Sequence, residues 1–197
     1  MNREFKWKNV ILTLFLLPSI LAPVVTAITF QMLYNYQYGP ISWLLRSVGL
    51  SRIDWLGSTT FSLPSIIIVD TWQWIPFMML VMLAGLQTIP DRYYEAAKMD
   101  GAPRIHTFFF ITIPLLTKSM ALALLIRVMD AVKLFDLVFV LTGGGPGTSS
   151  ETVPLYTYLS GFEFFRMGYT AAMSYIQLIF LVLLGQAFLK VWETDKP

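Results

Sequence analysis

The sequence predicts an all-α membrane protein with four transmembrane helices. Two observations lead to this fold class. Of the 197 residues, 56% are hydrophobic and only 13% are charged, whereas soluble domains carry about 25% charged residues. Four apolar runs, at residues 10–30, 63–86, 119–141 and 169–189, also reach the roughly 20 residues that a helix needs to cross a bilayer. Each is expected to be helical, because an open strand would leave unpaired backbone groups in lipid.

The first run is about 21 residues long, which exceeds the roughly 7–15 apolar residues of a signal peptide and favours a membrane span over a cleaved leader. The first two runs contain prolines at positions 18, 23, 64 and 76. Neighbouring groups in a membrane bundle can satisfy the backbone that such prolines free. The third run differs from the others because it contains four charged residues, which are Arg127, Asp130, Lys133 and Asp136.

Lysine and arginine placement predicts that both termini are cytoplasmic, because these residues collect on the cytoplasmic side of membrane proteins. With the N-terminus inside, nine of them lie in inside segments and three in outside loops. The inside residues are Arg3, Lys6, Lys8, Arg92, Lys98, Arg104, Lys118, Lys190 and Lys196, and the outside residues are Arg46, Arg52 and Arg166. The polar stretch between the second and third runs is therefore expected in the cytoplasm.

The two outside loops are each expected to contain one short helix. Residues 31–62 include Trp43 and Trp55, which suit a membrane interface, and a short helix over residues 41–48 is expected to end at Gly49. Residues 142–168 begin with TGGGPG, which predicts a flexible turn that ends a helix. The following segment, VPLYTYLSGFEFF, predicts a second short amphipathic or partly re-entrant helix.

Several classes of function are disfavoured. The chain has no cysteine and one histidine, so neither thiol chemistry nor a metal cluster is expected, and no phosphate-binding GxxxxGK[ST] loop occurs. A net charge of +2 with scattered basic residues does not indicate nucleic-acid binding. A membrane-embedded enzyme using Asp70, Asp130 or Asp136 would need convergent catalytic groups, and neither a nucleophile elbow nor HExxH is present. No catalytic residue and no cofactor is assigned.

The polar stretch predicts a helix, a glycine turn and a second helix. Thr88 can cap a helix whose first turn holds Pro90 and Asp91. Gly101 suits the left-handed position after the helix, and Pro103 suits the first turn of the next one. Within the first helix, Ala96 and Ala97 leave one side with only small side chains, so that another surface can approach closely. Tyr93 and Tyr94 supply aromatic anchors of the kind that interfaces favour. On these grounds alone the stretch is either a tight connecting loop or a docking surface.

One ordered motif identifies a family that this chain resembles. Glu95-Ala96-Ala97 is followed by Gly101 and then by Ile111-Thr112-Ile113-Pro114. This order resembles the EAA loop of membrane permease subunits of binding-protein-dependent ABC importers, with Ile113 where leucine is usual. The segments LAGLQTIPDRYYEAAKMDGAPRIHTFFFITIPLL and KLFDLVFVLTGGGPG are similar to the carbohydrate-type branch, the MalF-like or UgpA-like permeases. The resemblance extends over essentially the whole chain.

The resemblance implies a MetI-like helical bundle. Permeases of this branch usually have six membrane helices, and this chain resembles one that starts at the third. We therefore expect residues 1–197 to be an N-terminally truncated permease domain, with the EAA coupling loop over residues 88–118. The chain is expected to reside in the cell inner (cytoplasmic) membrane as a multi-pass protein.

The resemblance also implies partners and a function, namely import of a carbohydrate driven by a separate ATPase. The expected partners are a cytoplasmic ABC ATPase dimer, a second permease subunit, an extracytoplasmic solute-binding protein, a carbohydrate substrate and membrane lipid, with no nucleic acid. The coupling residues implied are Tyr93, Tyr94, Glu95, Ala96, Ala97, Asp100 and Gly101. The alternatives are a non-transporting truncated fragment or membrane scaffold and, less favoured, a membrane-embedded enzyme.

Candidate residues for the solute path lie on the second and third apolar runs. Charged residues inside a membrane usually face a cavity or a partner helix, so the four charges of the third run either line a path or form ion pairs that orient the bundle. Arg127 and Asp130 suit the structural role. Lys133 and Asp136 are placed on the path by the resemblance, and Asp70, Gln73 and Trp74 are further candidates. Sugar stacking would use the aromatic residues, which also suit a membrane interface.

Overall fold

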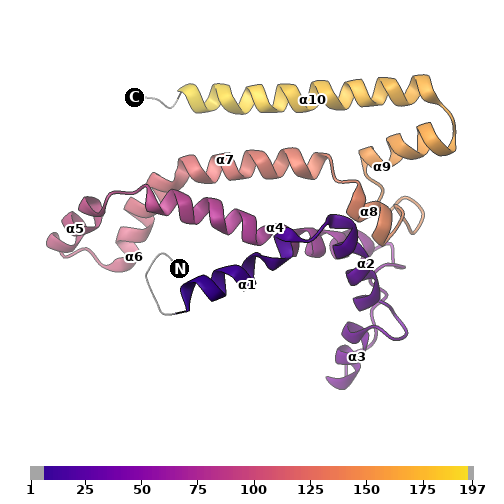
Figure 1. Ribbon diagram of the computed structural model, residues 1–197, viewed down its shortest axis with the longest axis horizontal. Coiled ribbons are helices and arrows are strands. Elements are labelled where there is room, and N and C mark those ends of the chain that lie inside the picture. Colours follow the sequence, from indigo (N-terminus) through magenta and orange to yellow (C-terminus); the bar gives the residue numbers. More distant parts are fainter. Residues whose placement is uncertain (1–6, 195–197) are drawn as a thin grey trace. The chain divides into compact units, whose positions relative to one another are not determined.

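The computed structural model describes residues 7–194, which form helices and connecting turns without a strand (Figure 1). Arg3, Lys6 and Lys196, counted above for orientation, lie outside the described residues. The elements are α1 (Lys8–Ile20), α2 (Pro23–Leu33), α3 (Pro40–Ser47), α4 (Ser62–Gln87), α5 (Asp91–Met99), α6 (Arg104–Thr107), the π-helix η1 (Phe108–Thr112), α7 (Ile113–Val132), α8 (Asp136–Leu141), α9 (Val153–Tyr158), the π-helix η2 (Leu159–Glu163) and α10 (Met167–Thr194).

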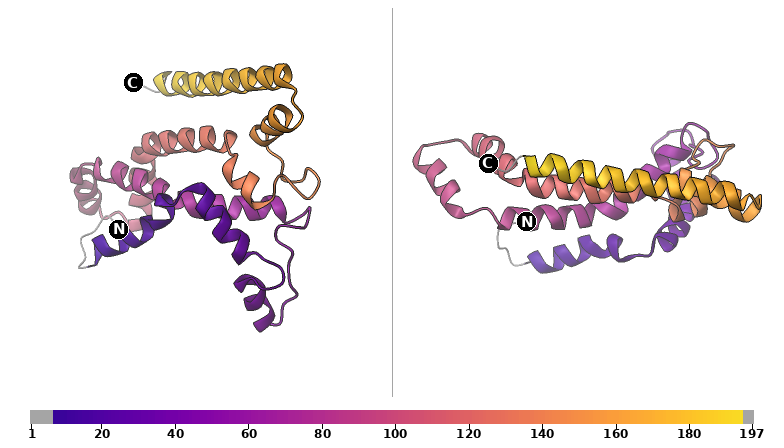
Figure 2. Two further views of the ribbon diagram at one scale, coloured as in Figure 1. Left: turned by 45° about the vertical axis from the view of Figure 1, so that its right-hand side comes forward. Right: turned by 90° about the horizontal axis from the view of Figure 1, so that it is seen from above.

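The chain divides into two compact units. The first contains the described residues up to Ile20 together with Trp74–Arg127, and the second contains Leu21–Gln73 together with the described residues from Val128 onward. The first unit therefore holds α1, the C-terminal part of α4, the polar stretch and most of α7. The second unit holds the remaining short helices and α10, which is drawn as one long helix in Figure 2.

Three described helical segments are long and apolar enough to cross a membrane, namely Ser62–Gln87, Arg104–Val132 and Met167–Lys190. They confirm that the second and fourth apolar runs are helices. The number of spans becomes four if α1 and α2 together form one broken span. The all-helical fold class is therefore confirmed, and the number of spans is three or four.

The expectation of one continuous helix over residues 10–30 was wrong. The helix ends at Ile20, and a new one begins at Pro23 after Ala22, whose φ of −61° and ψ of 139° are extended. The physical reason is the proline, which favours extended backbone in the residue before it and is well suited to the first position of a helix.

The expectation of one helix over residues 119–141 was also wrong. Helix α7 ends at Val132, and Phe135, with φ −120° and ψ −60°, precedes the separate helix α8. The four charges of this run therefore do not follow one helical stripe, since Lys133 and Asp136 lie beyond the end of α7. At its other end the helix reaches further than expected, because α6, η1 and α7 follow one another without a break from Arg104.

Both short helices expected in the loops after the first and third apolar runs are confirmed. Helix α3 covers Pro40–Ser47 and is followed by Gly49, whose φ of +80° is left-handed. In the second loop, α9 and η2 cover the expected segment from Val153 to Glu163. The TGGGPG stretch forms the turn after α8, with left-handed Gly143, Gly144 and Gly147.

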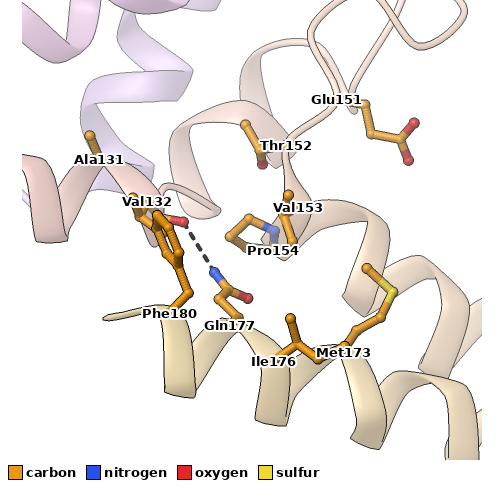
Figure 3. Close-up of a pocket in the computed structure, with 10 residues that line it drawn as sticks. All are labelled: Ala131, Val132, Glu151, Thr152, Val153, Pro154, Met173, Ile176, Gln177 and Phe180. Atoms are coloured by element: carbon orange, nitrogen blue, oxygen red, sulfur yellow. Dashed lines mark hydrogen bonds between the residues drawn. The ribbon is translucent and has the colours of Figure 1, made fainter. Parts of the chain in front are cut away.

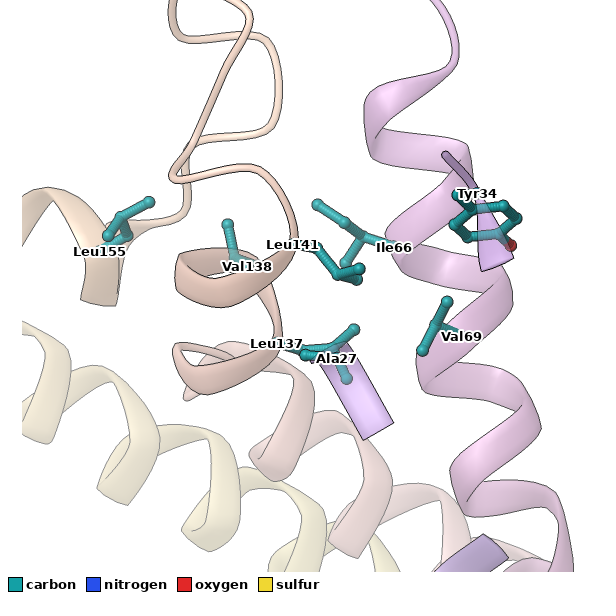
Figure 4. Close-up of a cluster of buried hydrophobic side chains, with 8 residues drawn as sticks. All are labelled: Ala27, Tyr34, Ile66, Val69, Leu137, Val138, Leu141 and Leu155. Carbon is teal, nitrogen blue, oxygen red and sulfur yellow. The ribbon is translucent and has the colours of Figure 1, made fainter. Parts of the chain in front are cut away.

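A buried apolar cluster holds the second unit together (Figure 4). It consists of Ala27, Tyr34, Ile66, Val69, Leu137, Val138, Leu141 and Leu155, contributed by α2, α4, α8 and α9 and the residue after α2. Helix α8 contributes three of these residues, Leu137, Val138 and Leu141. Burial raises the pKa of the Tyr34 phenol, because the anion would be poorly solvated there.

Candidate functional site

Helix α5 and its turn form an elbow between the apolar helices α4 and α7 (Figure 1). The expectation that Thr88 caps α5 was wrong, because its hydroxyl donates to the carbonyl oxygen of Gly85, at 2.8 Å. The N-cap is Pro90, with Asp91 in the first turn and Lys98 in the last. Both charges complement the helix dipole.

Gly101 ends α5 as the sequence predicts. Its φ is +68°, a conformation that is readily available only to glycine. The amide of Gly101 donates to Lys98 O at 3.1 Å, and the amide of Ala102 donates to Ala97 O at 2.9 Å. These two bonds make a Schellman motif, which satisfies the last carbonyl groups of the helix. Pro103 then directly precedes α6, so the chain turns sharply between two helices.

The candidate coupling residues divide between two sides of α5. Ala97 is buried and Tyr94 is half-buried, so both pack within the chain. The other five, Tyr93, Glu95, Ala96, Asp100 and Gly101, are exposed, and Met99 beside them is 88% exposed. The outer side thus offers an aromatic ring, two carboxylates and a small residue, with the Arg92 guanidinium carbon 5.2 Å from the centroid of the Tyr93 ring.

The inner side of the elbow contacts the start of the next membrane helix. The hydroxyls of Tyr94 and Thr112 lie 3.3 Å apart, and Thr112 is buried in η1. His106 lies in α6 and stacks on Phe110, with ring centroids 4.1 Å apart. No residue pattern in the sequence indicated the π-helical turn over Phe108–Thr112.

The candidate solute-path residues have distinct surroundings. In α4, Asp70 and Gln73 are buried, and the Gln73 amide donates to Leu21 O at 2.9 Å. Trp74 stacks edge-on against Phe77, with centroids 5.8 Å apart, and the guanidinium carbon of Arg127 lies 5.5 Å from its ring centroid. Arg127 thus contacts an aromatic face, an arrangement that attracts the cation to the ring.

The last two path candidates lie at the break after α7. Lys133 pairs with Asp130 at 3.6 Å, and their side chains are 54% and 33% exposed. Asp136 is exposed in the first turn of α8, where a carboxylate suits the helix dipole. The ion pair gives Lys133 a partner within the chain, and both Lys133 and Asp136 stay candidates for the path.

Sequence reasoning missed a pocket beside this break, with a volume of about 650 Å³ (Figure 3). Its polar contributors include Gln177 of α10 and Thr152. The Gln177 amide donates to Val132 O at 3.1 Å, and the Thr152 hydroxyl donates to Leu134 O at 2.9 Å. Side chains thus satisfy two carbonyls at the helix break. A glutamine inside the fourth apolar run was the signal available in the sequence.

The described residues define a multi-pass helical membrane protein with a polar elbow between two apolar helices. The chain belongs to the family described as "Binding-protein-dependent transport system inner membrane component", whose profile matches residues 1–192. This membership confirms the family resemblance and the membrane location. It identifies the chain as a transport permease and disfavours the alternative of a membrane-embedded enzyme.

Two relatives are permeases of sugar transport systems. The chain is 38% identical over 183 residues to the trehalose/maltose transport system permease protein MalF of Thermococcus litoralis, covering 93% of this chain and 61% of the relative. It is 35% identical over 179 residues to the sulfoquinovosyl glycerol transport system permease protein SmoG of Agrobacterium fabrum, covering 91% of this chain and 58% of the relative. The chain thus spans about three fifths of their lengths.

A solved structure shares the fold. It is a chain of a bacterial alginate ABC transporter, crystallised with a periplasmic protein bound to an alginate pentasaccharide. The TM-score is 0.85 at 22% identity, and the match covers 95% of this chain and 66% of that chain. The MetI-like permease fold expected from the sequence is therefore confirmed for the described helices.

Proposed function

We propose that the chain acts as a permease subunit of an ABC importer for a carbohydrate, and that its elbow couples transport to a separate ATPase. The observation that carries the coupling role is the exposed outer side of α5. This helix lies between two apolar helices in the chain and ends in the turn at Gly101. Family membership and the similarity to permeases of two sugar transport systems support the substrate class. Residues 1–197 then form one permease domain, with residues 88–118 as its coupling loop.

The proposed orientation follows from the charges, with both termini and the elbow in the cytoplasm. A groove on the ATPase dimer receives α5, where Glu95 pairs with a basic group and Tyr93 packs as an anchor. Closure of that dimer displaces the elbow. The membrane helices and those of a second permease subunit then rock around a central site, which a solute-binding protein supplies from the opposite side.

In this proposal Asp70, Trp74, Lys133 and Asp136 contribute to the solute path. Carboxylates accept hydrogen bonds from hydroxyl groups, and an indole face suits the apolar face of a sugar ring. Lys133 belongs to the same segment and is held by Asp130. The alternative is a non-transporting fragment or scaffold, which would not support carbohydrate uptake when assembled with the ATPase.

The first test reverses one charge on the outer side of the elbow. Glu95→Lys is expected to weaken association with the candidate ATPase about tenfold, equivalent to about 1.4 kcal/mol, because the outer side then repels a basic groove. Glu163→Lys is the matched control, since Glu163 is also exposed but lies in η2. Association is measured by co-purification from membranes and titration in detergent. Equal binding by both variants would show that the elbow does not contact the ATPase.

A second pair of variants tests the turn. Gly101 and Gly147 have similar left-handed backbones, with φ of +68° and +61°, and an added Cβ would meet no atom within 4 Å at either position. Alanine therefore introduces the same strain, about 1–2 kcal/mol, without a clash. Only Gly101→Ala is expected to weaken ATPase association. If Gly147→Ala weakened it equally, the loss would reflect general destabilisation and the coupling role of the turn would be rejected.

A further inference from the structure

The elbow is closed at its base by close packing of α4 against α7. A Cβ added at Gly85 of α4 would lie 2.6 Å from Ser119 Cβ and 3.0 Å from Leu116 Cδ2. The backbone of α4 therefore approaches α7 as closely as glycine allows, in the manner of small-residue contacts between membrane helices. Buried Ile89 lies just after this contact. The two ends of the elbow are thus fixed to each other before α5 begins.

A second contact crosses the elbow itself. Tyr94 reaches from the inner side of α5 to Thr112 in η1, with 3.3 Å between their hydroxyl oxygens. Thr112 is 6% exposed, and Ala97, one turn after Tyr94, is also 6% exposed. The hydroxyls therefore meet on the packed side of α5, away from the outer side that is proposed to dock.

The receiving segment has an unusual backbone. Residues Phe108–Thr112 form a π-helical turn, in which the Ile113 amide donates to Phe108 O, five residues back. The Thr112 hydroxyl also lies 3.4 Å from Thr107 O, another five-residue step. Such wide turns are rare and often occur at functional sites. Thr112 is thus both the last residue of this turn and the partner of Tyr94.

From these contacts we infer that Tyr94 is a positioning residue, which links the coupling helix α5 to the π-helical start of α7 through Thr112. The inference rests on the proposed coupling function. A displacement of α5 reaches α7 by two routes, the covalent turn at Gly101 and the Tyr94–Thr112 contact. The Tyr94–Thr112 contact joins α5 directly to η1 without passing through α6. It therefore holds the orientation of α5 relative to η1 while the elbow moves as one body.

The contact is tested first in the chain alone, by amide hydrogen exchange in detergent. Tyr94→Phe removes only the hydroxyl and is expected to speed exchange over residues 107–113 about fivefold, since one hydrogen bond contributes modestly to local stability. Tyr93→Phe is the matched control, because the neighbouring ring lies on the exposed side. Unchanged exchange in Tyr94→Phe would overturn the link whatever the chain's function.

The role in coupling is tested in the assembled transporter in proteoliposomes. Tyr94→Phe and Thr112→Val are each expected to keep ATPase association within about twofold of the parent and to lower transport per ATP hydrolysed about fivefold, with no further loss in the double variant. Thr112→Ser retains a hydroxyl and is expected to restore the ratio. Because Tyr94→Phe and Thr112→Val remove the same contact from its two ends, the test stays valid if one of these variants folds poorly.

Two results of the transport experiment would also contradict the inference. If transport per ATP hydrolysed were unchanged in both Tyr94→Phe and Thr112→Val, the contact would transmit nothing. If Tyr94→Phe lost ATPase association to the same extent as transport, Tyr94 would be a docking residue instead. Failure of the proposed function itself is separate, because it would appear as unchanged ATPase association in Glu95→Lys.

Discussion

The buried cluster of the second unit and the elbow of the first differ in how far their side chains are covered. Ile66, Leu137 and Leu155 are at most 1% exposed, whereas Met99 of the elbow and Ile105 of the following α6 are 88% and 75% exposed. The cluster is satisfied by contacts within this chain. The elbow presents groups that nothing in the described residues covers, as the proposed docking surface requires. Stability and coupling should therefore respond to different substitutions.

The largest expected effect on stability is in the cluster. Leu137→Ala should lower the free energy of unfolding by about 2–5 kcal/mol, because it leaves a cavity in a packed site. Met99→Ala, on the exposed side of the elbow, should change it by less than about 0.5 kcal/mol. Chemical unfolding of the purified chain in detergent measures both. Similar losses in the two variants would remove the contrast between the regions.

An intermediate effect is expected where the elbow joins the membrane helices. Gly85→Ala should destabilise the chain by about 1–3 kcal/mol, because the new Cβ would overlap Ser119 and push α4 from α7. Gly185→Ala in α10 is the control, since an added Cβ there would meet no described atom within 4 Å beyond its chain neighbours and its own helix backbone, and it should be neutral or slightly stabilising. Thermal unfolding of both variants is the measurement. A neutral Gly85→Ala would mean that the base of the elbow is not tightly packed.

The smallest effect is expected at the break after α7. Lys133→Gln removes the ion pair with Asp130, whose side chains are 54% and 33% exposed, and should cost no more than about 1 kcal/mol. The difference from the parent should shrink as salt is added. Unfolding at low and high ionic strength tests this. A loss above 2 kcal/mol, well beyond the range of about 0–1 kcal/mol for exposed pairs, would identify Lys133 as a structural centre of the second unit.

The fold class and most elements were predictable because they depend on local composition. Long apolar runs, the helix-stopping Gly49 and the left-handed Gly101 each act through their own backbone or hydropathy. The two helix breaks were missed although their prolines and charges were visible. Proline is tolerated inside many membrane helices, so Pro23 alone does not decide whether a run bends or breaks.

The candidate site was predictable in part. Glu95, Ala96 and Gly101 could be singled out by the ordered motif, and the structure places them on a compact elbow. The partner of Tyr94 could not be identified, because Thr112 is 18 residues away and reaches it only through the turn at Gly101 and the π-helical segment. Gln177 likewise acts on Val132, 45 residues earlier. Such pairings depend on how elements pack.

The sequence by itself determined that this protein is helical, membrane-embedded and equipped with a glycine-ended polar helix, since hydropathy and backbone conformation are local properties. Only the tertiary structure decided which side of α5 faces inward, where α7 gives way to α8, and which side chains satisfy the carbonyls freed at that break. The reason is physical. Burial and hydrogen bonding between distant residues are settled by packing, which separates the inward-facing Tyr94 from its exposed neighbour Tyr93.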